Sequence, residues 1–267
     1  MLEHVARAEA PMSLEELTRK SGLPKPTVHR ILALLQRGGL LLREPLGKRY
    51  GVGARLSSLA LEVLIHSPLR ARRHAILARL VEEIGETCNF TMLDGDEVVY
   101  VERVETSSPV RLHMEAGSRV PLHCTASGKL FLSRLPAAQV SELIGAGPYQ
   151  RHTERTITDL SALERELKRI RADSVGTDVG EYLEGSVCLA VPVLDARRRV
   201  CAAVAVHGPA PRMTLKKGLE YLPALRRAAL AIGATLVADA PVPAAPRARK
   251  RGSARKIGID SSNRRVS

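Results

Sequence analysis

Polar and basic side chains are spaced along one face of a predicted helix near the N-terminus, where they could contact a nucleic acid. Apolar residues recur at i, i+3, i+4 and i+7 and predict the buried stripe: Val28, Ile31, Leu32 and Leu35. The exposed side then carries Lys25, Thr27, His29, Arg30 and Arg37. Such side chains hydrogen-bond to base edges and phosphates. An ordinary helical hairpin with a solvated basic face is the alternative interpretation.

A second group of residues, Thr125–Gly128, could bind an anion. It precedes an apolar helix, whose first amides have no acceptor within the helix and lie at the positive end of its dipole. A carboxylate would suit that position, and a plain helix cap without ligand is the alternative. A nucleotide-binding loop is excluded, because His123 stands where that motif needs glycine and Leu130 follows Lys129.

The basic helix is preceded by a shorter helix and a turn. Ser13 and Glu16 have the spacing of a capping box, and Gly22 suits the turn that follows. Pro26 suits the first position of the second helix. The segment therefore predicts a helix-turn-helix whose second helix is the recognition helix.

A short basic hairpin follows the recognition helix. The apolar run 40–43 and the segment 50–52 have strand character, and residues 47–49 form the turn between them. A hairpin in this position is a wing, in which Arg43, Lys48 and Arg49 could contact phosphates or the minor groove. A charged tip is also typical of any exposed hairpin.

The composition favours two domains and a polyanionic partner. The chain has 267 residues and a net charge of +13. Residues 241–267 contain eight Lys or Arg against one Asp, so this segment alone contributes +7. Its low apolar content predicts a disordered tail, which either adds non-specific DNA affinity or only solubilises the protein.

The cysteines and the apolar segments limit the cellular context. Cys88, Cys124, Cys188 and Cys201 are too scattered for a zinc site and too few for a disulfide scaffold. No signal peptide or stretch of about 20 apolar residues occurs. We therefore expect a cytoplasmic protein without a metal or another cofactor.

The remainder of the chain predicts a linker helix and an α+β domain. In helix 54–66, which Pro68 ends, an apolar stripe could pair with a second subunit: Leu56, Leu59, Ala60, Val63 and Leu64. Further helices are expected at 2–9, 69–84, 126–135, 137–144, 159–172 and 215–237. Strands are expected at 88–93, 97–104, 110–114, 187–194 and 200–207. Hairpins flanked by helices indicate an antiparallel sheet.

The segment Gly117–Lys129, with a winged helix before it and Gly208-Pro209 after the last strand, resembles the isocitrate-lyase-regulator (IclR) type of transcription factor. The resemblance is collinear from about Leu2 to Asp239. It implies an α+β fold with an N-terminal winged helix-turn-helix, a dimerising linker helix and a C-terminal GAF-like effector domain with an antiparallel sheet. We expect these units at residues 1–53, 54–68 and 69–240.

The resemblance also implies the residues of an effector pocket. The family's amide pair matches Ala126 and Ser127, its acidic residue matches Asp178, and its cysteine matches Cys188, while Val120 would line the apolar side. Two family serines fall on Ala205 and His207, so the pocket differs from the glyoxylate and pyruvate type. The alternatives are ordinary ones: Cys188 as core filler, His207 as an exposed strand end, and Asp178 as the cap of a turn in loop 174–178.

The expected function is a ligand-responsive DNA-binding regulator, a repressor more often than an activator within the family. It would bind an operator as a dimer or a dimer of dimers and control genes of small organic acid or aromatic acid catabolism. An enzyme is the first alternative, because Ser127, Asp178 and either His123 or His207 are triad residue types, but no Gly-x-Ser-x-Gly elbow occurs. A DNA-coating protein is the second, and it would not need an effector domain.

Overall fold

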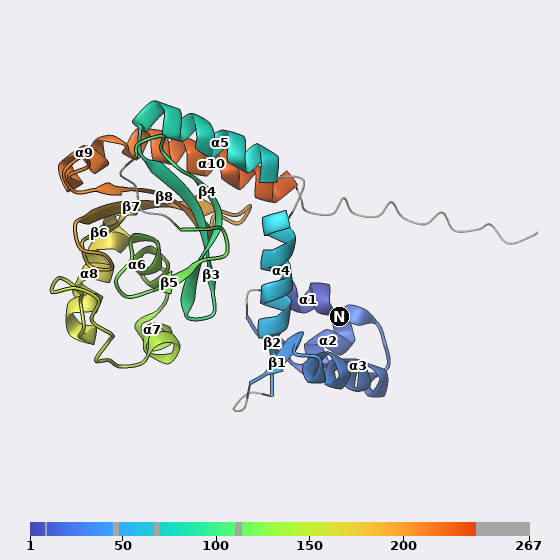
Figure 1. The fold of residues 1–267 in the computed structure, drawn as a ribbon. Helices are drawn as coiled ribbons and strands as arrows, with labels where there is room; N and C mark the ends of the chain where they lie inside the picture. Colours follow the sequence, from blue (N-terminus) through green and yellow to red (C-terminus); the bar gives the residue numbers. More distant parts are fainter. Residues whose placement is uncertain (9, 45–47, 67–69, 110–113, 239–267) are drawn as a thin grey trace, which may run out of the picture.

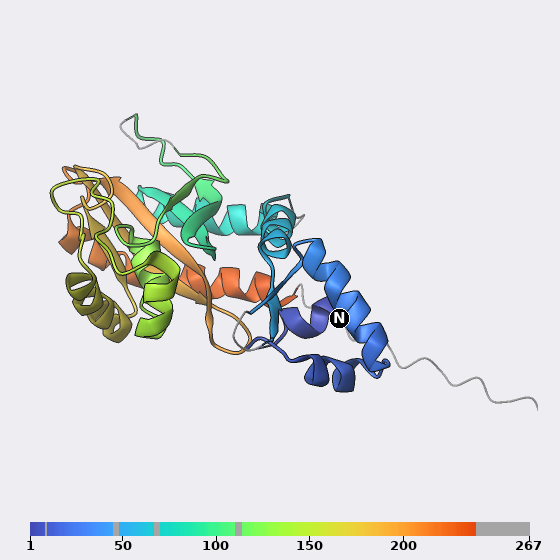
Figure 2. The same ribbon diagram turned by 90° about the horizontal axis from the view of Figure 1, so that it is seen from below.

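The computed structural model describes residues 1–8, 10–44, 48–66, 70–109 and 114–238. Figure 1 shows two units with helix α4 (Ala54–His66) between them, and Figure 2 shows the same arrangement from below. The predicted tail, 241–267, lies outside the described residues. Within the described residues, no helix is both long enough and apolar enough to cross a membrane.

The N-terminal unit is a helix-turn-helix followed by a two-stranded hairpin. Its elements are α1 (Leu2–Ala6), α2 (Leu14–Ser21), α3 (Lys25–Arg37), β1 (Leu41–Arg43) and β2 (Tyr50–Val52). The predicted capping box is present: the Ser13 hydroxyl accepts from the Glu16 amide at 3.2 Å, and the Glu16 carboxylate accepts from the Ser13 amide at 2.7 Å. Gly22 ends α2 with a φ of 67°, a left-handed conformation that glycine adopts readily.

The core of this unit uses the predicted stripe of α3. Val28 and Leu32 are fully buried, and Ile31 and Leu35 are partly buried. Two details differ from expectation. Helix α1 ends at Ala6, three residues before the predicted end, and α3 begins at Lys25, so Pro26 occupies its second position. Proline is tolerated there, because the amides of the first turn have no intrahelical acceptor.

The linker helix α4 has the predicted bounds, and its apolar residues divide between two sides. Leu61 is buried, and Leu64 and Ile65 pack against the core of the C-terminal part. Leu59 and Val63 instead remain 43% and 67% exposed. Part of the predicted stripe is therefore uncovered within a single chain.

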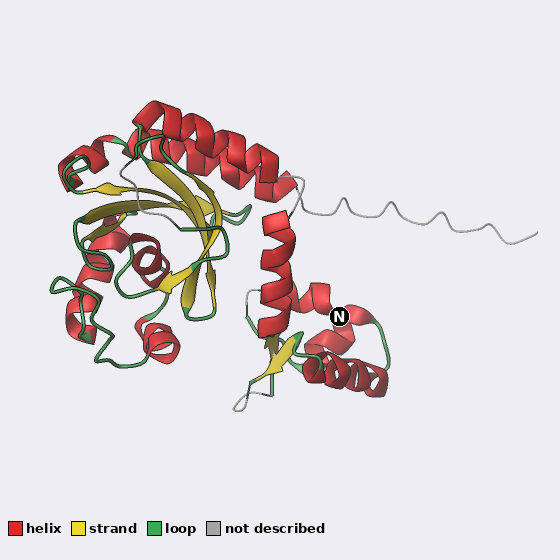
Figure 3. Ribbon diagram, viewed as in Figure 1, coloured by secondary structure: helices red, strands yellow, loops and turns green. Residues whose placement is uncertain are grey.

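The C-terminal part contains one six-stranded antiparallel sheet with the order β5-β4-β3-β8-β7-β6 (Figure 3). The strands are β3 (Thr87–Asp94), β4 (Glu97–Val104), β5 (Arg119–Pro121), β6 (Gly176–Val179), β7 (Ser186–Leu194) and β8 (Val200–Pro209). The helices are α5 (Arg70–Ile84), α6 (Ala126–Leu132), α7 (Ala137–Ile144), α8 (Leu160–Asp173), α9 (Leu215–Glu220) and α10 (Leu222–Ala238). Helices α5 and α10 cover one face of the sheet, and α6 and α8 lie on the other.

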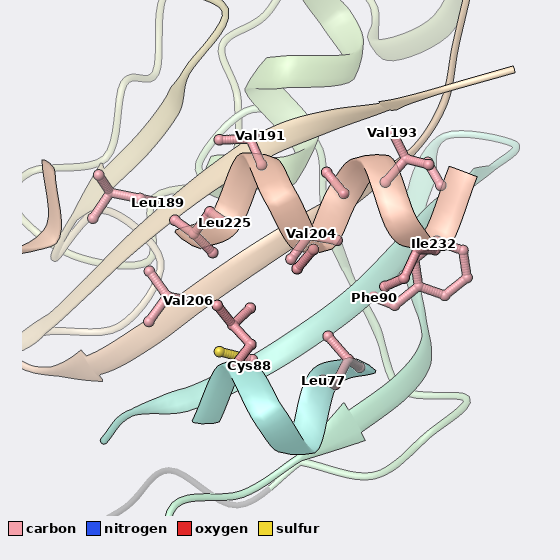
Figure 4. Packing of buried hydrophobic residues seen from close by; sticks show 14 of the residues in the cluster. Leu77, Cys88, Phe90, Leu189, Val191, Val193, Val204, Val206, Leu225 and Ile232 are labelled. Atoms are coloured by element: carbon pink, nitrogen blue, oxygen red, sulfur yellow. The ribbon is translucent and has the colours of Figure 1, made fainter. Parts of the chain in front are cut away.

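The larger core lies between the sheet and the α5–α10 layer. Figure 4 shows Leu77 of α5, Phe90 of β3, Val204 of β8 and Ile232 of α10 meeting there. All four are fully buried. Burial of apolar surface stabilises the fold by about 25 cal/mol per Å². This packing fixes the positions of β3 and β8, and therefore of the side chains on the opposite face of the sheet.

Two predicted elements were wrong in detail. Segment 174–178 is not a loop throughout, because residues 176–179 form the edge strand β6. The predicted helix 215–237 is two helices, since α9 ends before Tyr221 and Pro223 stands in the first turn of α10. Strand β5 was not expected. The strand predicted at 110–114 falls largely on residues outside the described part, and Met114 is not in a strand.

Candidate functional site

A cavity of about 390 Å³ is lined by the side chains predicted for the effector pocket. All six contribute, from strands β5, β6, β7 and β8 and from α6: Val120, Ala126, Ser127, Asp178, Cys188 and His207. Pairing in the sheet brings three of them together, because Cys188 of β7 is opposite Asp178 on one side and His207 on the other. The cavity therefore lies on the face of the sheet opposite α5 and α10.

The start of α6 lines this cavity with Thr125, Ala126 and Ser127. Thr125 caps the helix, accepting from the Gly128 amide at 3.2 Å and donating to the Pro121 carbonyl at 2.6 Å. A side chain at Gly128 would lie 2.4 Å from the Leu122 carbonyl oxygen, so the close approach requires glycine. The amides of Ala126 and Ser127 then remain without an acceptor within the helix.

Ser127 faces the sheet with its hydroxyl already engaged. Its oxygen accepts from the Thr91 hydroxyl on β3 at 3.0 Å, and the residue is buried. This hydrogen bond holds the Ser127 hydroxyl against β3.

His207 contributes a buried imidazole from β8. It is 5% exposed, and neither ring nitrogen has a hydrogen-bond partner within the described residues. Burial, aided by the positive charge of Arg103, lowers the pKa of His207 to about 4. Its ring is therefore neutral near pH 7, with one donor and one acceptor available to a molecule in the cavity.

Asp178 supplies the acidic group of the cavity from β6. Its Oδ1 atom accepts from the Glu181 amide at 2.7 Å, so the residue also caps the turn that follows the strand. Burial raises the pKa of Asp178 to about 6. This carboxyl titrates close to neutrality and can change its charge when the surroundings change.

The cavity also contains polar residues that the sequence did not single out: Asn89, Tyr100, His152, Tyr182 and Ser186. Asn89 accepts from the Arg103 guanidinium at 2.9 Å. Burial raises the pKa of Tyr100, which keeps its hydroxyl protonated. Asn89 could have been noticed as an amide inside an apolar strand, whereas His152 lies in a segment without periodicity.

The predicted DNA-contacting residues cluster at the N-terminal end of α3 and on the hairpin. Lys25, His29 and Arg30 are exposed, and Thr27 is half-buried. One shallow pocket between α2, α3 and the hairpin is lined by four of the predicted residues: Lys25, His29, Arg43 and Lys48. The Arg43 guanidinium lies 5.8 Å from the centre of the Tyr50 ring.

Arg49 differs from the other basic residues of the hairpin. Its guanidinium donates to the Pro11 carbonyl at 2.7 Å and lies 3.6 Å from the Glu16 carboxylate. It therefore tethers the hairpin to the segment before α2, which sequence reasoning did not anticipate. Lys48, by contrast, is exposed at the hairpin with a φ of 49°.

Comparison with known proteins decides the family. A model described as the IclR helix-turn-helix domain matches residues 1–45, and one described as the bacterial transcriptional regulator IclR C-terminal matches residues 61–234. The chain belongs to the IclR family of transcriptional regulators. The predicted family and the α+β, winged helix-turn-helix fold are thereby confirmed.

Named IclR-family relatives cover most of the chain. The probable transcriptional regulator SauR of Cupriavidus necator is 47% identical over 229 residues, covering 86% of this chain and 91% of the relative. The transcriptional repressor IclR of Escherichia coli is 30% identical over 223 residues, covering 83% and 81%. These relatives are regulators of transcription, not enzymes.

Solved structures of the IclR family agree. The Thermotoga maritima IclR crystal structure has a TM-score of 0.60 at 29% identity, covering 88% of this chain and 95% of that one. A double mutant of the PobR inducer-binding domain from Acinetobacter, in complex with 3-hydroxybenzoic acid, has a TM-score of 0.58 at 28% identity, covering 62% and 98%.

Proposed function

We propose that this IclR-family regulator binds a small organic acid in the cavity and that the bound acid changes its affinity for an operator. The observation that carries the proposal is His207, a buried and neutral imidazole that has no hydrogen-bond partner among the described residues and lies in the same cavity as all the other predicted effector residues. Burying a polar group without a hydrogen bond destabilises the fold, so a ligand that supplies the hydrogen-bond partner offsets this cost and binds more tightly.

The expected pose follows from the polarity of the cavity. The carboxylate would lie on the amides of Ala126 and Ser127, a hydroxyl or keto oxygen near Asp178 or His207, and the carbon skeleton against Val120 and Cys188. A volume of about 390 Å³ is at the lower end of the usual range for ligand pockets. It has room for a small or medium acid, aliphatic or with a single aromatic ring.

On the DNA side, the proposal assigns α3 to the major groove and the hairpin to the flanking backbone. Residues 1–53 would be the DNA-binding domain, 54–68 the dimerising linker and 69–240 the effector domain. Two recognition helices in a dimer, or four in a dimer of dimers, require a pseudo-palindromic operator. We propose that the protein acts in the cytoplasm and represses catabolic genes.

The effector half is tested by calorimetry on the full-length protein with a panel of organic acids that includes pyruvate, glyoxylate and 3-hydroxybenzoate. At least one acid should bind the parent at a 1:1 ratio, and His207→Gln and Asp178→Asn should each lower that affinity at least tenfold. His29→Gln, far from the cavity, is the matched control. Unchanged affinity in both cavity variants would place the ligand elsewhere.

The operator half is tested separately, by footprinting on genomic fragments that the protein enriches. A protected pseudo-palindrome whose occupancy changes with the bound acid supports a regulator. Salt-dependent binding without sequence preference would instead favour a DNA-coating protein.

A further inference from the structure

Three side chains with nitrogen and sulfur donors meet beside the effector cavity. His123 and Cys124 immediately precede the cap of α6, and His152 comes from the segment between α7 and α8. Their ligand atoms all lie within 4.8 Å of one another. The spacing of the cysteines in the sequence argued against a zinc site, but the fold adds two histidines to a single cysteine.

The His123 ring is held as the ring of a metal ligand usually is. Its Nε2 atom lies 2.9 Å from the backbone carbonyl of Gln150. A ring that donates from Nε2 leaves the Nδ1 lone pair free, and ligating histidines commonly use a backbone carbonyl in this way.

His152 provides the second, independent observation. Its Nε2 atom is buried and has no hydrogen-bond partner within the described residues. Its ring centre lies 5.9 Å from that of His123 and 5.1 Å from that of Tyr182. The nitrogen is thus desolvated beside two other donors, where a coordinated ion would satisfy it.

The charges around Cys124 permit a cation. The cysteine is fully buried and is not in a disulfide. Lys129 is nearby, but its ammonium is paired with both Glu166 and Glu181, and the second Glu181 oxygen, Oε2, has no hydrogen-bond partner within the described residues. The positive charge of the lysine is therefore offset.

We propose that His123, Cys124 and His152 bind a divalent d-block ion of the zinc class. Two imidazoles and one thiolate favour such an ion and disfavour Mg²⁺ and Ca²⁺, which prefer oxygen ligands. Binding forms one metal–sulfur and two metal–nitrogen bonds, and the thiol proton passes to solvent. Donor atoms around tetrahedral zinc lie roughly 3.3–3.6 Å apart, so the three side chains need to close by at most about 1.5 Å.

Three protein ligands leave a fourth position open to water. His152 also lines the effector cavity, so the ion would lie in the cavity wall. The inference does not depend on the proposed function, because the metal is measured without effector or DNA.

The test titrates metal-free, untagged full-length protein with Co²⁺ and then Zn²⁺. One equivalent of Co²⁺ should give a thiolate-to-cobalt charge-transfer band that Zn²⁺ removes. Cys124→Ser should abolish the band, and Cys124→Ser and His152→Gln should each lower the Zn²⁺ affinity at least tenfold. The controls Cys201→Ser and His4→Gln alter the same residue types elsewhere in the chain. They should leave the charge-transfer band and the Zn²⁺ affinity unchanged.

The Co²⁺ titration of the parent protein is sufficient to overturn the inference, so the test does not require any variant to fold. Absence of the charge-transfer band at one equivalent of Co²⁺ would show that no thiolate binds the ion. A band that survives Cys124→Ser, or that disappears instead in Cys188→Ser or Cys201→Ser, would assign the metal to another cysteine.

Discussion

Burial determines the protonation of the residue that most distinguishes this cavity, His207. Its pKa is about 4 in the folded protein and 6.5 in an unfolded chain. Between these values the unfolded chain holds more protons, so stability is lost as the pH falls. Asp178 and Glu181 have raised pKa values of about 6 and about 7 and act in the opposite direction. The His207 contribution is therefore visible only as a difference between variants.

The first prediction concerns that difference. When the pH falls from 7 to 5, the His207 contribution should lower the free energy of unfolding of the parent by about 2 kcal/mol. The His207→Gln variant should lack this decrease. Urea unfolding of the parent and the variant at both pH values measures it. The exposed His29→Gln should follow the parent. An identical pH response of parent and His207→Gln would mean that His207 is not held neutral in the fold.

The second prediction separates the backbone of Ser127 from its side chain. Ser127→Ala should leave effector affinity within about threefold, because the hydroxyl bonds Thr91 and not the ligand. The loss of that hydrogen bond should cost about 1 kcal/mol of stability. Ser127→Glu should abolish binding, since its carboxylate would occupy the place of the effector's. Calorimetry decides, and a large loss of affinity in Ser127→Ala would contradict the backbone role.

For individual residues, the sequence predicted which side chains line the cavity but not their protonation states. Residue types and the family resemblance were enough to nominate Asp178 and His207. Their shifted pKa values depend on desolvation by strands far away in the chain, which no local pattern encodes. The approach of His152 to Cys124 likewise depends on how the segment before α8 folds back, and it left no signal in the sequence.

Among the elements, α3 and the hairpin should make different kinds of DNA contact. Arg30→Ala should weaken operator binding and relax base preference by about 1–3 kcal/mol, because an arginine on this face can pair with a guanine edge. Lys48→Ala should weaken all sequences alike and lower the salt slope by about 0.9. Arg49→Ala should change the slope less, since its side chain bonds Pro11. Footprinting and salt titration measure these effects, and equal slopes for both hairpin variants would contradict the distinction.

The linker helix α4 carries the fourth prediction. Leu59 and Val63 are exposed in the single chain and should be covered by the same helix of a second subunit. Leu59→Glu and Val63→Glu should give monomers that bind DNA poorly, and Ser58→Glu, on another face, should not. Light scattering reports the mass, and an unchanged mass in both apolar-stripe variants would exclude this interface.

Long, periodic elements were predictable, and short edges were not. The linker helix α4 matched its predicted bounds, and α5 and the two hairpins matched to within about two residues, because their apolar spacing is regular over many residues. Strands β5 and β6 span only three and four residues, too few for a period to appear. The break between α9 and α10 does have a signal in the sequence, because Pro223 disfavours a continuous helix.

In the molecule as a whole, a buried arginine connects the sheet that lines the cavity with the linker helix, beside the apolar contacts of Leu61, Leu64 and Ile65. Arg73 of α5 is fully buried, donates to the Leu64 carbonyl near the end of α4, and lies 5.9 Å from the centre of the Phe90 ring on β3. Phe90 follows Asn89, which lines the cavity, and precedes Thr91, which bonds Ser127. A shift of β3 on effector binding would thus reach α4 through a continuous set of contacts.

The last prediction tests that route. Arg73→Met keeps the apolar volume but removes the hydrogen bond to Leu64, so effector and operator should each still bind while their mutual influence falls. Allosteric coupling is typically about 1–3 kcal/mol, and we expect it to drop below about 0.5 kcal/mol in this variant. Operator affinity with and without the acid that the panel identifies measures it, with the exposed Arg72→Met as the matched control. Because coupling is reciprocal, the effect of operator DNA on effector affinity must shrink by the same factor, and full coupling in Arg73→Met would exclude this route.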